Sequence, residues 1–146
     1  MTNISQSRSP SFFKRIAAIF YELLLLMAVF SIVTFLFILI FGNATEGFNH
    51  FALQVTLWLV GGMYFVFSWM KTGQTLAMKT WCIKLESMNG ELLSLNRAIL
   101  RYVLATAGVM FFGAGFLWAL FDREGLYLHD RLIGSRLRLI AKHYLL

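Results

Sequence analysis

The chain has 146 residues, of which 59% are hydrophobic, and its mean hydropathy is +0.70. This composition excludes a water-soluble domain with an ordinary polar surface and predicts that lipid surrounds most of the chain. The length leaves room for a single domain, residues 1–146, and none for a separate soluble enzyme.

The net charge of +6 does not predict nucleic-acid binding, because the basic residues lie beside apolar segments. The positive-inside rule and anionic lipid headgroups account for them, so we expect the lipid bilayer as a partner and no nucleic acid. Cys82 is the only cysteine, which excludes an intramolecular disulfide. His50 and His143 have no carboxylate or cysteine at ligand spacing, so we expect no metal site and no cofactor.

The first apolar segment, residues 16–41, contains one charged residue, Glu22. At about 1.5 Å per residue, a helix of this length exceeds a hydrocarbon core of about 30 Å. Lys14 and Arg15 precede it as the basic region of a signal peptide would. The stretch is too long for a signal peptide and no small-residue cleavage site follows, so the segment is predicted to stay as a membrane anchor.

The second apolar segment, residues 51–70, also has the length of a transmembrane helix. Gly61 and Gly62 would let a neighbouring helix approach closely. The connecting loop, residues 42–50, contains Glu46 and no lysine or arginine, which predicts that it lies outside the cell.

Basic residues gather before the first segment and after the second. Because cytoplasmic loops carry the excess of lysine and arginine, the amino terminus and the loop 71–97 are predicted to lie in the cytoplasm. This pattern indicates a multi-pass protein of the bacterial cytoplasmic membrane. The basic residues are Arg8, Lys14, Arg15, Lys71, Lys79, Lys84, Arg97 and Arg101.

The third apolar segment, residues 98–121, has two interpretations. It is long enough to cross, but a crossing would export the tail, residues 122–146, which contains five basic residues. Glycines 108, 113 and 115 would instead let it break into two half-helices that re-enter on one side. Counting segments favours the crossing, and counting charges favours the re-entrant form.

Residues 80–86 alternate in a way that predicts a strand. Trp81, Ile83 and Leu85 fall on one side, and the turn dipeptide Asn89-Gly90 follows. Residues 136–139 of the tail alternate in the same way, so the two segments are predicted to pair as a small β-hairpin-like sheet on the cytoplasmic surface. Pairing requires the tail to be cytoplasmic, which tips the balance toward a re-entrant third segment. The expected fold is therefore an all-α membrane protein with three hydrophobic helical segments and this small β element.

An ordered set of short motifs resembles the RDD family of bacterial membrane proteins, named for an arginine and two aspartates. The resemblance covers about residues 12–140, and it implies that Arg15 and Asp130 are the family's arginine and second aspartate, with Glu22 in place of the first aspartate. Ala77 stands where the family usually has glycine, which puts a tight turn there in doubt. The resemblance implies a transport module, with sodium/proton antiport in some members. The motifs are Arg15-Ile16-Ala17-Ala18, Gly73-Gln74-Thr75-Leu76, Asn89-Gly90, residues 97–101, Phe121-Asp122-Arg123 and residues 128–135.

Arg15 and Glu22 are seven residues apart, so they share one helix face, with Glu22 about 10 Å deeper in the membrane. A carboxylate at that depth is costly unless it is paired, protonated or wetted, and such a group can exchange a proton for a cation. One interpretation is an ion or proton site in which Arg15 sets the potential and Asp130 reaches in from the tail. The other is that Glu22 makes a structural hydrogen bond or ion pair and Arg15 extends to lipid phosphates.

Residues near these three supply supporting candidates. His129 beside Asp130 is either a proton relay or part of a turn that anchors the tail, and the turn is favoured. Gly73, Gln74 and Thr75 are either a helix end followed by a new helix start, which is favoured, or a substrate loop. Arg101 is expected to be an interface anchor.

Two functions remain open from the sequence. The first is a small oligomeric transporter of a proton or monovalent cation that uses Glu22, since three segments rarely enclose a path alone. The second is a membrane anchor or accessory subunit that docks an unidentified partner through a basic surface around Lys84, Arg136 and Arg138. No nucleophile elbow, phosphate-binding loop or hydrolase carboxylate pair is present, so an enzyme is not expected.

Overall fold

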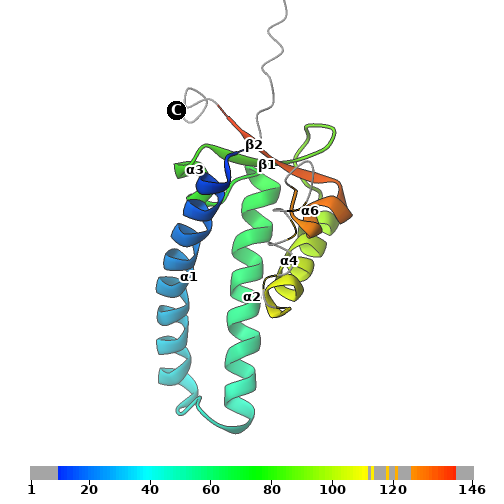
Figure 1. Ribbon diagram of the computed structural model, residues 1–146. Coiled ribbons are helices and arrows are strands. Elements are labelled where there is room, and N and C mark those ends of the chain that lie inside the picture. Colours follow the sequence, from blue (N-terminus) through cyan, green and yellow to red (C-terminus); the bar gives the residue numbers. More distant parts are fainter. Residues whose placement is uncertain (1–9, 112, 114–117, 119–120, 122–125, 141–146) are drawn as a thin grey trace, which may run out of the picture.

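A computed structural model of the chain describes residues 10–111, 113, 118, 121 and 126–140. Within them the chain forms two long helices, three shorter helices and one two-stranded sheet (Figure 1). The elements are α1 (Phe12–Phe41), α2 (Gly47–Lys71), α3 (Leu76–Thr80), β1 (Ile83–Ser87), α4 (Leu95–Met110), α6 (Leu128–Ile133) and β2 (Ser135–Leu139).

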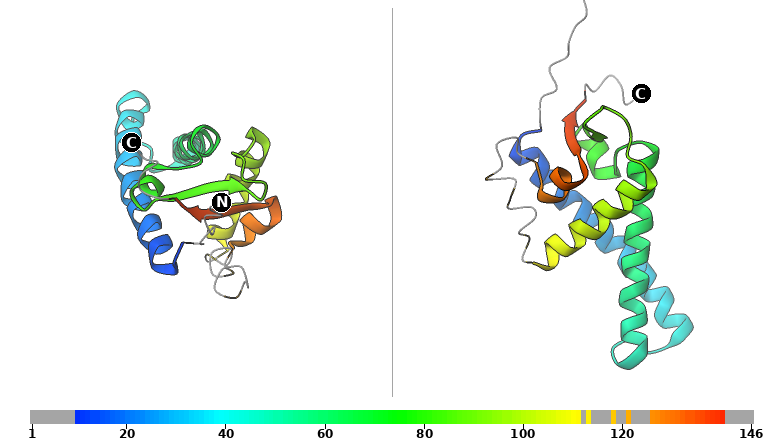
Figure 2. Two further views of the ribbon diagram at one scale, coloured as in Figure 1. Left: turned by 90° about the horizontal axis from the view of Figure 1, so that it is seen from above. Right: turned by 90° about the vertical axis from the view of Figure 1, so that its right-hand side faces the viewer.

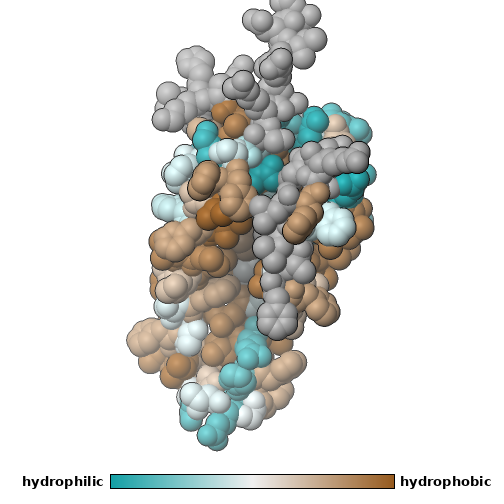
Figure 3. All heavy atoms as spheres, viewed as in Figure 1, coloured by the Kyte–Doolittle hydropathy of each residue, from teal (hydrophilic) through white to brown (hydrophobic). Residues whose placement is uncertain are grey.

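The helices α1 and α2 form a long antiparallel hairpin. No proline or glycine interrupts α1, and the chain leaves it at Gly42, whose φ of +78° suits glycine. Both helices are long and apolar enough to cross a membrane, which confirms the first two predicted segments. Only 6% of the most apolar window of each is buried, and Figure 3 shows hydrophobic side chains on their outer surface. Hydrocarbon can cover such a surface, whereas water cannot do so without a large cost.

The third predicted segment is not found as one helix. The helix α4 begins at Leu95, ends at Met110 and lies along the half of α2 nearest the sheet (Figure 1). Gly113 has a φ of +72°, which ends a right-handed helix. Most of the predicted segment beyond Phe111 lies outside the described residues. A third apolar helix long enough to span is therefore absent from the described part of the chain.

The predicted pairing of the loop with the tail is confirmed. Strands β1 and β2 are antiparallel and in a register that sets Leu85 opposite Leu137 and Glu86 opposite Arg136. The pair is not hairpin-like, because α4 and α6 lie between the strands in sequence. The strand also starts later than predicted: Trp81 follows the short helix α3 and is 37% exposed instead of sharing the buried side of Leu85.

The folded core lies at the sheet end of the molecule. The sheet crosses over the ends of the helices, as seen from above in Figure 2. Side chains from α2, β1, α4, α6 and the loop before α4 meet there, so this end is held together by packing in the ordinary way. The buried cluster consists of Trp69, Leu85, Leu93, Ala98 and Ile133.

Gly61 and Gly62 are where a second helix approaches α2 closely, as their sequence predicts. The ring of Tyr102 from α4 lies against both, and a Cβ at Gly62 would be 2.9 Å from that ring. The Tyr102 hydroxyl donates to the carbonyl of Trp58 at 2.8 Å. This contact sets the distance between α2 and α4.

Candidate functional site

A buried polar stripe runs along the first turns of α1. Arg15, Ala18 and Glu22 are buried, while most other positions of the helix are exposed. Their spacing of three and four residues places them on one face, and α1 contacts both α2 and α3. The face that Arg15 and Glu22 are predicted to share is therefore the face of α1 that packs against the rest of the protein.

The Glu22 carboxylate meets the connection between α2 and α3. Its Oε2 accepts a hydrogen bond from the hydroxyl of Thr75. The hydroxyl of Tyr64 interacts with the same carboxylate and accepts the backbone N–H of Leu76 at 3.2 Å. The other oxygen, Oε1, is buried and has no hydrogen-bond partner in the described part of the chain. One oxygen thus makes the structural bond of the second interpretation, and the other is left unpartnered.

Thr75 reaches Glu22 because of the way the chain turns after α2. Gly73 adopts a φ of +70°, and a Cβ there would lie 2.6 Å from the carbonyl oxygen of Leu85. Thr75 is the N-cap of α3 and accepts the N–H of Met78 at 3.3 Å. A helix end followed by a new helix start, the favoured interpretation, is what the structure has. Ala77 is fully buried inside α3, so no glycine turn forms at that position.

The segment Gly73–Thr75 is also tied to the sheet. The carbonyl of Gly73 accepts the N–H of Leu85 at 2.7 Å, and the side chain of Gln74 donates to the carbonyl of Ile83 at 2.7 Å. These two bonds pair two of the backbone groups on the edge of β1 that faces away from β2. The side chain of Gln74 thus pairs with a backbone group of the strand instead of pointing into solvent.

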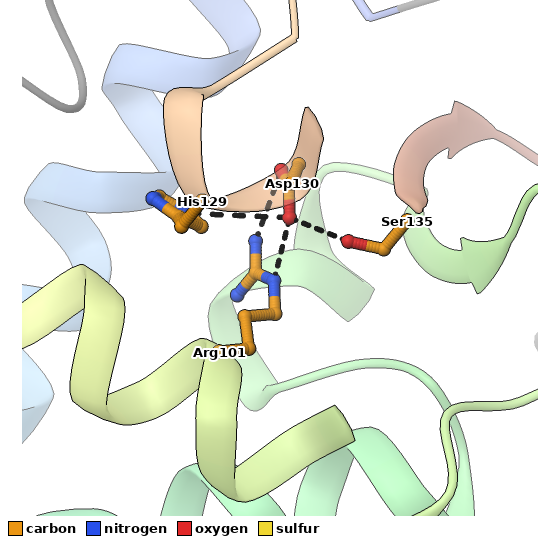
Figure 4. Close-up of polar contacts among 4 residues, drawn as sticks. All are labelled: Arg101, His129, Asp130 and Ser135. Atoms are coloured by element: carbon orange, nitrogen blue, oxygen red, sulfur yellow. Dashed lines mark hydrogen bonds and ion pairs between the residues drawn. The ribbon is translucent and has the colours of Figure 1, made fainter. Parts of the chain in front are cut away.

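A second cluster lies beside the first, around Asp130 in α6. Arg101 of α4 donates to both oxygens of Asp130, at 2.7 and 3.2 Å, and Ser135 donates to Oδ1 at 2.8 Å (Figure 4). The Arg101 guanidinium also lies 4.3 Å from the ring of Trp69. The expectation that Arg101 is an interface anchor is therefore wrong, because its guanidinium is buried in a bidentate ion pair.

The pKa values of this cluster follow from its burial. Burial alone would raise the pKa of Asp130, but the charge and hydrogen bonds of Arg101 and the bond from Ser135 hold that pKa below its usual value. Burial, helped by the Arg101 charge, lowers the pKa of His129 to about 4. The His129 ring stacks on Tyr127 at 5.4 Å and is neutral near pH 7. A pKa near 4 does not suit a relay at neutral pH and favours the anchoring turn.

Arg15 connects α1 to this second cluster. Its Nε donates to the carbonyl of Pro10 at 3.1 Å, and its guanidinium lies 5.6 Å from the ring of Tyr127. Arg15 is only 8% exposed, so the interpretation that it extends to lipid phosphates is wrong. Burial raises the pKa of the Tyr127 hydroxyl, which keeps it neutral.

The three principal candidates do not converge on one point. Asp130 pairs with Arg101 rather than reaching Glu22, while Arg15 contacts the segment that leads into α6. Sequence reasoning missed Tyr64 and Ser135, whose only signals are a hydroxyl in an apolar helix and a serine after the turn at Gly134. Among the described residues no three His, Cys, Asp or Glu side chains gather. The oxygens of Glu22, Thr75 and Tyr64 are the hard ligands available to a cation.

The fold and this buried polar end define a class: a helical membrane protein whose two long apolar helices carry a polar, sheet-capped end. A family model described as RDD family matches residues 9–134. The chain belongs to the RDD family, as its motifs predict. Comparison with curated proteins and with solved structures found no match.

Proposed function

We propose that this protein is a small, homo-oligomeric carrier that moves a proton or a monovalent cation across the bacterial cytoplasmic membrane through Glu22. The main observation behind the proposal is that the Glu22 carboxyl group is buried and incompletely hydrogen-bonded. Glu22 lies on a helix long and apolar enough to cross a bilayer, it is 9% exposed, and its Oε1 has no hydrogen-bond partner in the described part of the chain.

The chemistry follows from that unpartnered oxygen. A buried carboxylate is stable only when its charge is neutralised, and a proton or a cation can do this in exchange for the other. Thr75 and Tyr64 add hydroxyl oxygens beside it, which suit a small hard cation.

The direction of insertion is part of the proposal. The charged start of α1, the end of α2 and both strands lie at one end of the molecule, and the uncharged middle of the helices follows (Figures 1 and 3). The positive-inside rule assigns this end to the cytoplasm. The pairing of β1 with β2 supports a tail on the same side, and hence a third segment that does not cross. Two crossing helices enclose no path, which is why a homo-oligomer is required.

Flux in inverted membrane vesicles tests the proposal. A proton gradient should collapse on addition of sodium or another monovalent cation in vesicles containing the wild-type protein. Glu22→Gln should abolish the response because an amide does not titrate. Glu46→Gln, at the opposite end of the molecule, should leave it unchanged. The absence of cation-dependent flux with the wild-type protein, or its persistence with Glu22→Gln, would remove the proposal.

A second function is favoured by the surface of the sheet. Lys84 faces Arg138 and Glu86 faces Arg136 across the strands, so three cationic side chains and one carboxylate belong to neighbouring pairs of the sheet. Glu86 lies 3.7 Å from Arg136 and 3.4 Å from Arg138. Glu86 neutralises only part of the positive charge of Lys84, Arg136 and Arg138. The net positive surface of the sheet would suit an accessory subunit that docks an acidic partner. Cross-linking in mild detergent should then recover a stoichiometric partner, and a pure homo-oligomer would count against this function.

A further inference from the structure

We infer that the protein contains a conformational link through which the state of the Glu22 side chain controls the sheet at the cytoplasmic end. The link is the segment Gly73–Thr75. It goes beyond the proposed function, because it rests on contacts that exist whether or not an ion is carried.

The first step of the link is the bond between Glu22 and Thr75. The two residues are far apart in sequence and belong to different elements, and both are buried. The Thr75 hydroxyl donates to Glu22 while accepting the N–H of Met78 at the start of α3. A carboxyl group that takes up a proton or a cation becomes a poorer acceptor, so the hydrogen bond from the Thr75 hydroxyl weakens in that state.

The second step is the attachment of the same segment to β1. Within two residues of Thr75, Gly73 accepts the N–H of Leu85 and Gln74 donates to Ile83, both at 2.7 Å. The segment has little freedom to move without breaking these bonds, because Gly73 already occupies a left-handed conformation directly against the Leu85 carbonyl. A shift of Thr75 is therefore passed on to the edge of the sheet.

The third step carries the change to the tail. Strand β1 pairs with β2 along its whole length, and Ser135 at the start of β2 donates to Asp130. The sheet thus joins the intramembrane carboxyl group to the Arg101–Asp130 ion pair and to the basic surface of Arg136 and Arg138. The geometry therefore lets the state of the Glu22 side chain be read out at the sheet.

Amide hydrogen exchange of the purified protein in detergent micelles, measured by NMR, tests the link. The N–H of Leu85 faces the segment, whereas those of Lys84 and Glu86 face β2, as the alternation of an antiparallel pair requires. Glu22→Leu removes the acceptor and should speed exchange at Leu85 on the order of tenfold, the effect of one lost buried hydrogen bond, with little change at Lys84 and Glu86.

Conservative and control variants make the result specific. Glu22→Gln reproduces the neutral carboxyl group, whose oxygen accepts more weakly than a carboxylate, so exchange at Leu85 should fall between the wild-type rate and that of Glu22→Leu. Thr75→Val interrupts the link but keeps the carboxyl group, so its effect on exchange does not depend on flux, and failure of the link and failure of the carrier are distinguishable. Thr75→Val should speed exchange at Leu85, and Thr75→Ser should not. Ser31→Ala removes a hydroxyl deeper in α1 that donates to the Met27 carbonyl of the same helix, and should have no effect.

Three results would overturn the link. The first is unchanged exchange at Leu85 in both Glu22→Leu and Thr75→Val. The second is equal acceleration at Leu85, Lys84 and Glu86, which would mean that the whole sheet loosens. The third is acceleration at Leu85 in Ser31→Ala. If Glu22→Leu does not accumulate in the membrane, Thr75→Val and Thr75→Ser give the same decision.

Discussion

Asp130→Asn should destabilise the protein more than any other single removal of a charge in the described part of the chain. Asp130 accepts three hydrogen bonds, two from Arg101 and one from Ser135, and its side chain is 1% exposed. The substitution keeps the shape but leaves the guanidinium of Arg101, whose side chain is 8% exposed, without its counter-ion. Breaking a buried pair in this way costs about 3–5 kcal/mol in the free energy of unfolding.

The assay is reversible unfolding in mixed detergent micelles, followed by tryptophan fluorescence. Trp69 reports directly, since the Arg101 guanidinium lies 4.3 Å from its ring. Glu46→Gln in the exposed loop is the matched control and should change the free energy by less than about 0.5 kcal/mol. Replacing both partners, Arg101→Met with Asp130→Leu, should recover most of the loss because no charge then remains buried. A loss below about 1 kcal/mol for Asp130→Asn, the range of an exposed pair, would refute the reasoning.

Three further perturbations should behave as follows. Gly73→Ala should cost at least about 2 kcal/mol in the same unfolding assay, because φ is +70° and the new Cβ would lie 2.6 Å from the Leu85 carbonyl oxygen; a neutral effect would contradict the tight turn. Gly62→Ala should cost roughly 1 kcal/mol, since overpacking against Tyr102 exceeds the gain of about 1 kcal/mol in helix propensity; a stabilised variant would mean that the ring moves freely. The pKa of His129 is about 4 in the folded state and 6.5 in the unfolded chain, so between pH 6.5 and pH 4 the unfolded state binds more protons. The free energy of unfolding should therefore fall by about 3 kcal/mol as the pH drops from 6.5 to 4. Comparing unfolding of wild type and His129→Asn across this range isolates the effect, and parallel pH profiles would contradict it.

The two long helices could be predicted from the sequence because a membrane-spanning helix requires hydrophobic residues along its whole length, and hydrophobicity can be summed residue by residue. Every residue from Leu23 to Phe41 is uncharged, and a run of that length has few other solutions. The strand pairing could be predicted for a related reason, since Leu85 and Leu137 each belong to a period of two. Helices α1 and α2 each begin four residues before the predicted segments 16–41 and 51–70, because a helix can start in polar residues that a count of apolar residues leaves out.

The partners of the polar residues could not be predicted in the same way. Arg101 and Asp130 are distant in sequence, and nothing in either segment says that they meet. Tyr64 lies in an apolar helix, and no residue near it in the sequence indicates what its hydroxyl group would contact. Burial of Arg15 against Tyr127 depends on how the tail folds back, which is a tertiary effect. Sequence therefore identified most of the polar residues that matter but not their pairing.

The motifs and the structure group Arg15, Glu22 and Asp130 differently. The motifs identified the family and picked out Arg15, Glu22 and Asp130 as a set. The structure divides that set between two neighbouring clusters, one at the Glu22 carboxylate and one at the Arg101–Asp130 pair. The helical spacing alone had already placed Arg15 and Glu22 on one face, which the burial pattern of α1 agrees with.

Labelling of Glu22 by a hydrophobic carbodiimide in membranes, quantified by mass spectrometry, tests the central claim most directly. The reagent adds to protonated carboxyl groups in apolar surroundings, so a Glu22 that is buried in an apolar helix and exchanges protons for cations should react in preference to the exposed Glu46. The reaction should slow when sodium is added or the pH is raised. No adduct at Glu22, or a rate indifferent to both sodium and pH, would contradict the account.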